Sequence, residues 1–363
     1  MTVNLHDPNR LLLLGTMKGL FLATPAGGGW TLAEPAFKGH TVYAATLDQR
    51  QGRRRLWAAA SSPFWGTHLC WSDDMGATWT IPEEALVKFP EEAGASLNQI
   101  WQIVAPENDP DVLYCGVEPA ALFKSDDVGV TWKLCQGLWN HPHRPQWSPG
   151  GGGLCLHTVV THPEDPKRLL IAISTGGVYQ SEDGGESWRV TNKGVTAEFL
   201  PDKFPEFGQC VHKVQRSPAN PDQLFLQNHW GVFRSDDHGE NWVDIGNEGL
   251  PSDFGFGLAI TDTGAACVIP LEADTFRCTP EGKLRVYRTA DGGASWKALT
   301  NGLPQQDAFE TVLRDAFTSD GSALAFGTRS GKVFGSPDGG DSWEQIFAGL
   351  PPVTMVRTTT VIA

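Results

Sequence analysis

An eight-residue pattern that returns six times constrains the fold of this chain more than any other feature of its sequence. It reads SDDMGATW at Ser72–Trp79 and SDDVGVTW at Ser125–Trp132, and variants of it begin at residues 181, 235, 289 and 336. Successive copies start 53, 56, 54, 54 and 47 residues apart. A period of this length predicts a ring or array built from one repeated structural unit.

Each period contains four short apolar runs separated by turn residues. In residues 154–193 the runs LCLHTVVTHP, RLLIAIST and VYQ alternate with the turns EDPK and GG, and SWRVTNKG closes the repeat. Such runs bounded by Gly, Pro and Asp are typical of antiparallel strands. Four strands per repeat are typical of a β-propeller blade. We therefore expect one all-β domain over residues 1–363, with complete blades at 40–82, 98–136, 154–193, 209–246, 255–300 and 310–347.

The two ends of the chain predict a seventh blade. Residues 10–35 supply its second, third and fourth strands, and Thr24–Trp30 (TPAGGGW) is a shortened copy of the octet. The missing first strand matches residues 353–363, VTMVRTTTVIA. Pairing the C-terminal strand with the N-terminal blade removes exposed sheet edges, which otherwise promote aggregation. The expected fold is a closed seven-bladed propeller of four-stranded blades.

The octet itself is expected to build turns. It falls between the third and fourth strands, where a short loop needs a positive φ and therefore glycine. Asp and Ser side chains bond to the backbone of such turns, and the closing Trp buries a large ring. Six turns spread around one rim cannot converge on a substrate. We therefore assign a structural role to the aspartates of the octets, which are Asp74, Asp127, Asp183, Asp237, Asp291 and Asp338.

The octets resemble the Asp-box, or BNR, repeats of bacterial sialidases, xyloglucan-active endoglucanases and photosystem II assembly factors. The resemblance covers nearly the whole chain and implies a β-propeller of the sialidase-like superfamily, with the boxes on the face away from any active site. It is less specific for function, because enzymes and scaffolds share the repeat. The chain is also similar to uncharacterised BNR-repeat glycosyl hydrolases.

The chain departs from each of these families. Sialidases use six blades, an arginine triad and a tyrosine nucleophile, whereas the inner arginines Arg314 and Arg329 come from one expected blade. The xyloglucan-active enzymes use two rings, and the photosystem factors carry an arginine-rich patch that this chain lacks. We therefore expect a hydrolase of the glycosidase-like kind rather than a true sialidase.

The charge and the cysteine content limit which classes of binding partner and which cellular compartment we expect. A formal net charge of −14 argues against nucleic acid and anionic membranes, which need clustered Lys and Arg. The N-terminus lacks a signal-peptide pattern, and no run approaches 18 apolar residues. Seven cysteines without a CxxC pair are typical of a reduced protein. We expect a cytoplasmic location.

The ligand site is expected at one mouth of the central channel. The inner strands and the loops after the second strands converge there, and they carry polar groups beside aromatic faces, which suit a sugar ring or another flat ligand. The expected ligand-binding residues are Trp65, Gln99, Trp101, Glu118, Trp147, Asn228, His229, Trp230, Arg314 and Arg329.

Two sets of residues are candidates for chemistry. His157 and His212 occupy equivalent positions in adjacent blades, so one acts as acid or base, or both bind zinc or iron with His229. The remaining alternative is a pair of hydrogen-bonded channel histidines. Glycosidases need two carboxylates, for which Glu272 and Glu310 are the candidates.

These observations predict a glycoside hydrolase-like enzyme. It would act on a small polar or carbohydrate-like ligand at the channel mouth, by histidine acid–base or metal-assisted chemistry, and its cofactor under the second scheme is a divalent metal. The alternative is a non-catalytic scaffold that uses one face of the propeller to dock a protein partner.

Overall fold

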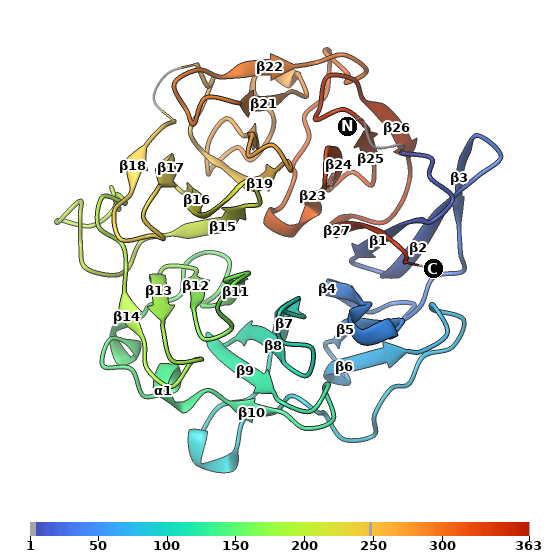
Figure 1. Ribbon diagram of the computed structural model, residues 1–363. Helices are drawn as coiled ribbons and strands as arrows, with labels where there is room; N and C mark the ends of the chain where they lie inside the picture. The colour runs from blue at the N-terminus through green and yellow to red at the C-terminus, as the bar shows by residue number, and fades with distance from the viewer. Residues whose placement is uncertain (1–4, 247–248, 363) are drawn as a thin grey trace.

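The computed structural model describes residues 5–246 and 249–362. Its strands form seven antiparallel sheets that surround a central channel as blades (Figure 1). The seven-bladed all-β propeller predicted from the repeat is confirmed. Ala363, at the end of the expected C-terminal strand, lies outside the described residues.

The strands of each blade run from the channel outward. Blade 1 contains β27 (Val353–Thr360), β1 (Arg10–Thr16), β2 (Gly19–Ala26) and β3 (Gly29–Leu32). Blade 2 contains β4 (Thr41–Asp48), β5 (Arg55–Ser62) and β6 (Gly66–Ser72). Blade 3 contains β7 (Gln99–Val104), β8 (Leu113–Glu118), β9 (Ala121–Ser125) and β10 (Lys133–Leu134). Blade 4 contains β11 (Leu156–Thr161), β12 (Leu169–Ile173), β13 (Gly177–Ser181) and β14 (Arg189–Val190).

The remaining blades follow the same plan. Blade 5 contains β15 (Val211–Ser217), β16 (Asn220–Asn228), β17 (Gly231–Ser235) and β18 (Val243–Asp244). Blade 6 contains β19 (Gly255–Ile260), β20 (Ala266–Pro270), β21 (Val286–Thr289) and β22 (Lys297–Leu299). Blade 7 contains β23 (Phe317–Asp320), β24 (Ala323–Gly327), β25 (Val333–Ser336) and β26 (Glu344–Phe347).

Helical segments are short and confined to the connections. They are α1 (Gln136–Trp139), η1 (Arg50–Gly52), η2 (Glu91–Ala93), η3 (Arg144–Gln146), η4 (Pro280–Gly282) and η5 (Arg314–Ala316). Among the described helices, none has the length and apolar character needed to cross a membrane. In blade 2 a single backbone bridge between Trp71 and Thr80 stands where the other blades have a fourth strand.

Blade 1 closes the ring by joining the two ends of the chain, as Figure 1 shows where β27 lies beside β1. Antiparallel pairing extends from Arg10 opposite Thr360 to Thr16 opposite Val353. The guanidinium of Arg10 is buried, and it donates to Thr358 Oγ1 at 2.8 Å and to Asp320 Oδ2 at 3.1 Å. This ion pair also connects blade 1 to blade 7.

Each octet folds into one hydrogen-bonded turn. In the first copy, Ser72 Oγ donates to Asp74 Oδ1 and accepts from the Gly76 N–H, both at 2.8 Å. Asp74 also accepts from the backbone and side chain of Thr78, and these bonds lower its pKa to about 2. The other five octets repeat these bonds, with Thr289 in place of the serine in the octet that begins at residue 289. The aspartates are therefore occupied in holding their own turns.

Two octet tryptophans, Trp242 and Trp296, connect neighbouring blades through their indole N–H groups. The Trp242 backbone N–H and indole N–H of blade 5 donate to Lys193 and Thr191 of blade 4, at 2.9 and 3.0 Å. In the same way the Trp296 indole of blade 6 donates to Ile245 of blade 5 at 2.8 Å. An indole spends most of its surface on apolar packing and keeps one donor for such a bond.

The strand order separates two rims. In antiparallel strands, the start of the first strand and the connection from second to third lie at one end of the blade, and the octet turn lies at the other. The octets therefore share one rim, and the inner strands begin at the opposite rim, which we call the channel mouth.

Candidate functional site at the channel mouth

A β-bulge recurs where the inner strands leave the channel mouth. Pairing with the second strand skips Tyr43 in β4, Trp101 in β7, His157 in β11 and His212 in β15. In β19 the shift falls between Gly255 and Leu258 and includes Phe256. A bulge adds a residue that re-aims its side chain and is often found beside functional sites. Five blades thus present one re-aimed side chain each around the same opening.

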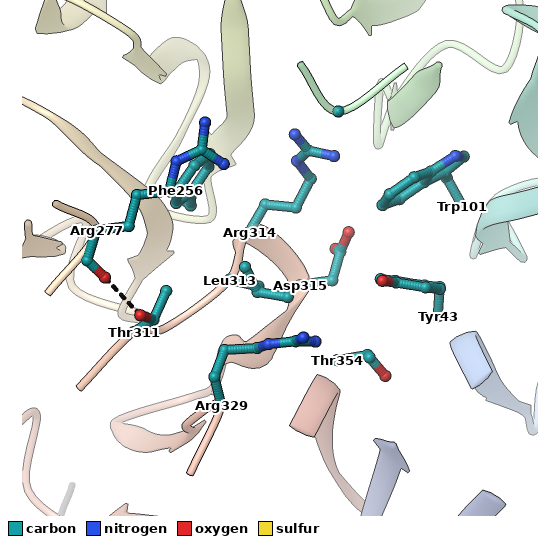
Figure 2. Close-up of a pocket in the computed structure, with 11 residues that line it drawn as sticks. Tyr43, Trp101, Phe256, Arg277, Thr311, Leu313, Arg314, Asp315, Arg329 and Thr354 are labelled. Carbon is teal, nitrogen blue, oxygen red and sulfur yellow. Dashed lines mark hydrogen bonds between the residues drawn. The ribbon is translucent and has the colours of Figure 1, made fainter. Parts of the chain in front are cut away.

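Three of these bulge residues line a cavity of about 410 Å³ at the channel mouth (Figure 2). We call it the mouth cavity, and it is lined by Tyr43, Trp101, Gly152, Phe256, Arg277, Thr311, Leu313, Arg314, Asp315, Arg329 and Thr354. The volume suits a small ligand, since ligand pockets span roughly 300–1,000 Å³. The walls therefore combine aromatic rings with guanidinium groups.

Arg314 occupies the centre of the cavity wall. It begins η5, and its guanidinium carbon lies 5.1 Å from the Trp101 ring centre and 6.0 Å from that of Phe256. The guanidinium carbon of Arg277 lies 5.3 Å from the centre of the Phe256 ring. In Figure 2 the side chains of Arg314 and Arg329 point into the cavity from the same blade. Stacking on aromatic faces holds guanidinium groups in place while leaving their N–H donors available.

A buried ion pair supports this wall. Lys213 of β15 donates to Asp315 of η5, and both side chains are largely buried. Burial lowers the pKa of Lys213, and the Asp315 carboxylate acts in the opposite direction. Asp315 is the one carboxylate among the described lining residues, so three arginines leave the cavity with an excess of positive charge. This contrasts with the acidic chain as a whole, whose formal net charge is −14.

The indole of Trp101 is fixed from both sides. Its ring centre lies 4.6 Å from that of Tyr43, and its N–H donates to Glu118 Oε2 at 3.0 Å. Glu118 is thus in the second layer behind the cavity and orients the indole. Gln99, at the start of the same strand, uses its amide to reach the Ile100 carbonyl at 3.1 Å.

His157 cannot act as the expected acid, base or metal ligand. Its side chain is completely buried, Nε2 donates to the Val211 carbonyl at 2.9 Å, and Nδ1 accepts from Thr158 Oγ1 at 2.9 Å. Burial, reinforced by Arg314 and Lys213, holds its pKa well below the usual value. His157 is the hydrogen-bonded channel histidine of the structural alternative, and it joins blade 4 to blade 5.

His157→Ala is expected to lower the free energy of unfolding by about 2–4 kcal/mol, because it opens a cavity and leaves the Val211 carbonyl without its donor. The native imidazole stays neutral while the unfolded one gains a proton near pH 6.5, so wild-type stability falls as the pH drops below that value. The slope is about 1.4 kcal/mol per pH unit for each such group. Urea unfolding at pH 8 and pH 5 should show a smaller pH loss in the variant, whereas His68→Ala, at the edge of an exposed loop, should match the wild type.

His212 lies next to the cavity rather than in it. Its ring stacks on Phe256 with 4.4 Å between centres, and its Nδ1 donates to the Gly255 carbonyl at 2.6 Å. Burial, followed by the charge of Arg314, holds its pKa well below the usual value. His229 lies beside it, 5.4 Å away between ring centres, and the pKa of His229 is lowered by burial despite the Asp274 carboxylate.

The expected tryptophan wall is only partly formed. Trp147 is buried in the apolar core and donates to the Tyr179 hydroxyl at 2.9 Å, so its prediction as a ligand contact is wrong. Trp65 is 76% exposed on the tip of the β5–β6 hairpin. Trp230 stacks on Phe199 at 5.0 Å, next to His229. Of the four tryptophans expected to bind the ligand, Trp101 lines the mouth cavity.

The expected carboxylate pair is not assembled. Glu310 is buried, and its oxygens bind Lys332 Nζ at 2.8 Å and Ser330 Oγ at 2.6 Å. Glu272 is exposed in the β20–β21 connection. Neither lines the cavity. Asn228 is also buried, and its amide donates to the Thr196 carbonyl at 2.7 Å, so it holds a loop instead of a ligand.

Tyr43, Phe256, Arg277 and Asp315 line the cavity but were not expected from the sequence. Tyr43 and Phe256 lie at the β-bulges of β4 and β19. The alternation of side chains along a strand does not reveal a bulge. One extra residue moves the side chains that follow it to the opposite face of the strand. Arg277 and Asp315 lie in a loop and a 3₁₀ turn that have no equivalent in the other repeats.

Comparisons with known proteins give distant relatives. No protein-family model matches the chain. It is 23% identical over 248 residues to a probable oligoxyloglucan-reducing end-specific xyloglucanase of Neosartorya fischeri. This alignment covers 62% of this chain and 27% of the relative. It is 24% identical over 226 residues to xyloglucanase Xgh74A of Acetivibrio thermocellus, covering 54% and 25%. The chain thus spans about a quarter of the length of these curated relatives.

Solved structures share the propeller. An ancestral GH74 enzyme gives a TM-score of 0.58 at 16% identity, over 96% of this chain and 40% of the other. The periplasmic gluconolactonase of Pseudomonas aeruginosa gives 0.59 at 14% identity, over 97% and 99%. At these identities the likeness shows the fold. The curated relatives named above are xyloglucanases, so distant homologues of the chain are glycoside hydrolases. Membership of the Asp-box families and a cytoplasmic location stay predictions.

Proposed function

We propose that this protein is a glycosidase-like enzyme whose ligand is a sugar with an anionic group, bound in the mouth cavity. The observation that carries the proposal is the convergence of Arg277, Arg314 and Arg329 on one cavity with aromatic walls. Guanidinium groups bind carboxylates through paired N–H donors, and Trp101 and Phe256 offer flat surfaces for the sugar ring. The xyloglucanase relatives support a carbohydrate as the ligand.

The same cavity offers two groups for bond cleavage. Asp315 and Tyr43 both line it, and in Figure 2 the carboxylate and the phenol oxygen point toward the same space. Most glycosidases use two carboxylates, but a tyrosine replaces the nucleophilic carboxylate in sialidases. We assign the nucleophile to Tyr43 and the acid–base role to Asp315. This replaces the Glu272–Glu310 pair.

A matched pair of ligands tests the proposal. An oligosaccharide that ends in glucuronate is expected to bind at least tenfold more tightly than the same oligosaccharide ending in glucose, measured by isothermal titration calorimetry in low salt. The preference should shrink as sodium chloride is added, because salt screens the attraction. Equal affinity for the two ligands would reject the anionic-sugar proposal.

Hydrolysis is measured on the same samples. With fluorogenic uronides, sialosides and neutral glycosides as substrates, we expect turnover of an acidic glycoside. Tyr43→Phe and Asp315→Asn should each lower the rate at least 100-fold while leaving ligand binding within a few-fold. Tight binding without turnover of any acidic glycoside would leave a sugar-binding protein and reject the enzymatic part.

A second candidate function is docking of a protein partner, as in the scaffold alternative. It is favoured by the β5–β6 hairpin, where Phe64 is 86% and Trp65 is 76% exposed. Large aromatic side chains that are exposed next to each other mark interaction sites, whereas single exposed apolar residues are common on any protein surface. A double Phe64→Ser, Trp65→Ser variant would abolish such docking and leave sugar binding in the mouth cavity unchanged.

A further inference from the structure

A cysteine and two histidines meet at the mouth end of blade 5, outside the mouth cavity. Cys210 directly precedes β15, His212 is the bulge residue of that strand, and His229 lies in the turn between β16 and β17. One potential ligand atom of each lies within 4.8 Å of those of the other two. The turn is fixed to the strand by a hydrogen bond from the His229 N–H to the Cys210 carbonyl, at 3.0 Å. The backbone thus brings all three side chains to one point.

The hydrogen bonds of His212 prepare it for a metal. Its Nδ1 must carry the proton, because it donates to the Gly255 carbonyl. The lone pair is therefore on Nε2, which lies 3.7 Å from Cys210 Sγ. A backbone carbonyl behind the outer ring nitrogen is the usual support of a metal-binding histidine. A histidine coordinates a metal through the unprotonated nitrogen of its neutral ring, and Nε2 is that nitrogen here.

The separation of the ligand atoms fits a tetrahedral ion. Bonds of about 2.3 Å to sulfur and about 2.0–2.1 Å to nitrogen place the two ligands about 3.5 Å apart at a tetrahedral angle. The observed separation of Cys210 Sγ and His212 Nε2 is 3.7 Å. One thiolate with two imidazoles is a ligand set that binds zinc in preference to calcium or magnesium.

Charged groups of both signs lie around the site. Arg314 and Arg277 lie close enough to lower the pKa of His212, and their positive charges oppose a cation. Asp274 Oδ2 lies 3.5 Å from His229 Nε2. A Cys210 thiolate and the Asp274 carboxylate carry two negative charges, which attract Zn²⁺ and offset the charges of the two arginines. A carboxylate that bonds a histidine also orients it toward a metal.

We propose that Cys210, His212 and His229 bind one zinc ion, with its fourth position open. The site adjoins the mouth cavity but does not share its lining, since none of its three residues lines that cavity. It differs from the metal site expected from the sequence, because Cys210 takes the place of His157. Three protein ligands and an open position are the pattern of zinc sites that bind an exchangeable fourth ligand.

Metal titration of the full-length chain tests the site. After treatment with a chelator and dialysis, Zn²⁺ is titrated calorimetrically, and Co²⁺ is added to a parallel sample for absorption spectroscopy. We expect one ion per chain and a thiolate-to-cobalt charge-transfer band. Cys210→Ala should remove the band and weaken zinc binding at least 100-fold, and His229→Ala should weaken it at least tenfold. Cys278→Ala, at another half-buried free cysteine, should change neither.

Proton release separates coordination from a merely structural role of the cysteine. A cysteine binds zinc as the thiolate, so coordination by Cys210 releases the proton of its thiol. Titrations in two buffers of different ionisation enthalpy should show this proton in the wild type and not in Cys210→Ser. Circular dichroism confirms that each variant is folded. Failure of the wild type to bind one zinc ion, or equal binding by the Cys210 and Cys278 variants, would overturn the proposal.

Discussion

Arg314→Ala is expected to weaken binding of the glucuronate-terminated oligosaccharide about 100-fold, or about 2.7 kcal/mol. Arg314 lies between Trp101 and Phe256 and is the central donor of the mouth cavity. A charge-assisted pair in a partly dry site contributes more than a surface ion pair, because removing one partner leaves the other charge poorly solvated. Affinity for the glucose-terminated ligand should change by less than threefold.

Two further variants serve as controls for Arg314→Ala. Arg314→Lys keeps the charge but loses the planar fork, so it should recover only part of the affinity. Arg55→Ala removes an arginine that pairs with Asp73 near the octet rim, and it should bind the ligand as the wild type does. Calorimetric titration of all four proteins gives the comparison. A twofold or smaller effect of Arg314→Ala, with the fold intact, would mean that the cavity does not bind the anionic group.

Ending the chain at residue 352 is expected to prevent cooperative folding. The truncation removes β27, exposes the whole edge of β1 and leaves the buried Arg10 without Thr358. It also removes the buried side chains of Val353, Met355 and Val356. Burial of each such side chain contributes about 1.5–3 kcal/mol, and the hydrogen bond from the charged Arg10 guanidinium to Thr358 contributes about 1.5–3 kcal/mol. The total reaches the stability of an ordinary domain, about 5–15 kcal/mol.

The matched control ends at residue 360 and keeps all of β27. It should be soluble and should unfold in one thermal transition within a few degrees of the full chain. The shorter chain should show no transition by scanning calorimetry. If the chain that ends at residue 352 unfolds cooperatively near the wild-type temperature, ring closure through blade 1 is not required for folding.

The fold could be predicted because its information is local and repeated. Each octet forms its turn through contacts among neighbours in sequence, such as Ser72, Asp74 and Gly76. Each of the six copies therefore predicts the same turn separately. Ring closure could be predicted because the N-terminal segment supplies only three of the four strands of a blade. Blade 2 departs from the expected four-stranded blade in its outermost strand, which is reduced to the bridge between Trp71 and Thr80.

The site could be predicted only where it follows the repeat. Trp101, Arg314 and Arg329 reach the expected place, because the alignment of blades locates inner strands and their loops. Tyr43 was missed by one residue at a bulge. The burial of a side chain depends on contacts between blades, which a single sequence does not contain. His157 and Trp147 were misassigned for that reason, since both have the right composition for a site but face a neighbouring element.

A crystal structure with the glucuronate-terminated oligosaccharide bound would show directly whether the three arginines hold the anionic group. We expect the ligand carboxylate within hydrogen-bonding distance of Arg314 and of at least one of Arg277 and Arg329, with the sugar ring against Trp101 or Phe256. A ligand bound elsewhere, on the octet rim for example, or one that turns its carboxylate away from all three arginines, would contradict this expectation.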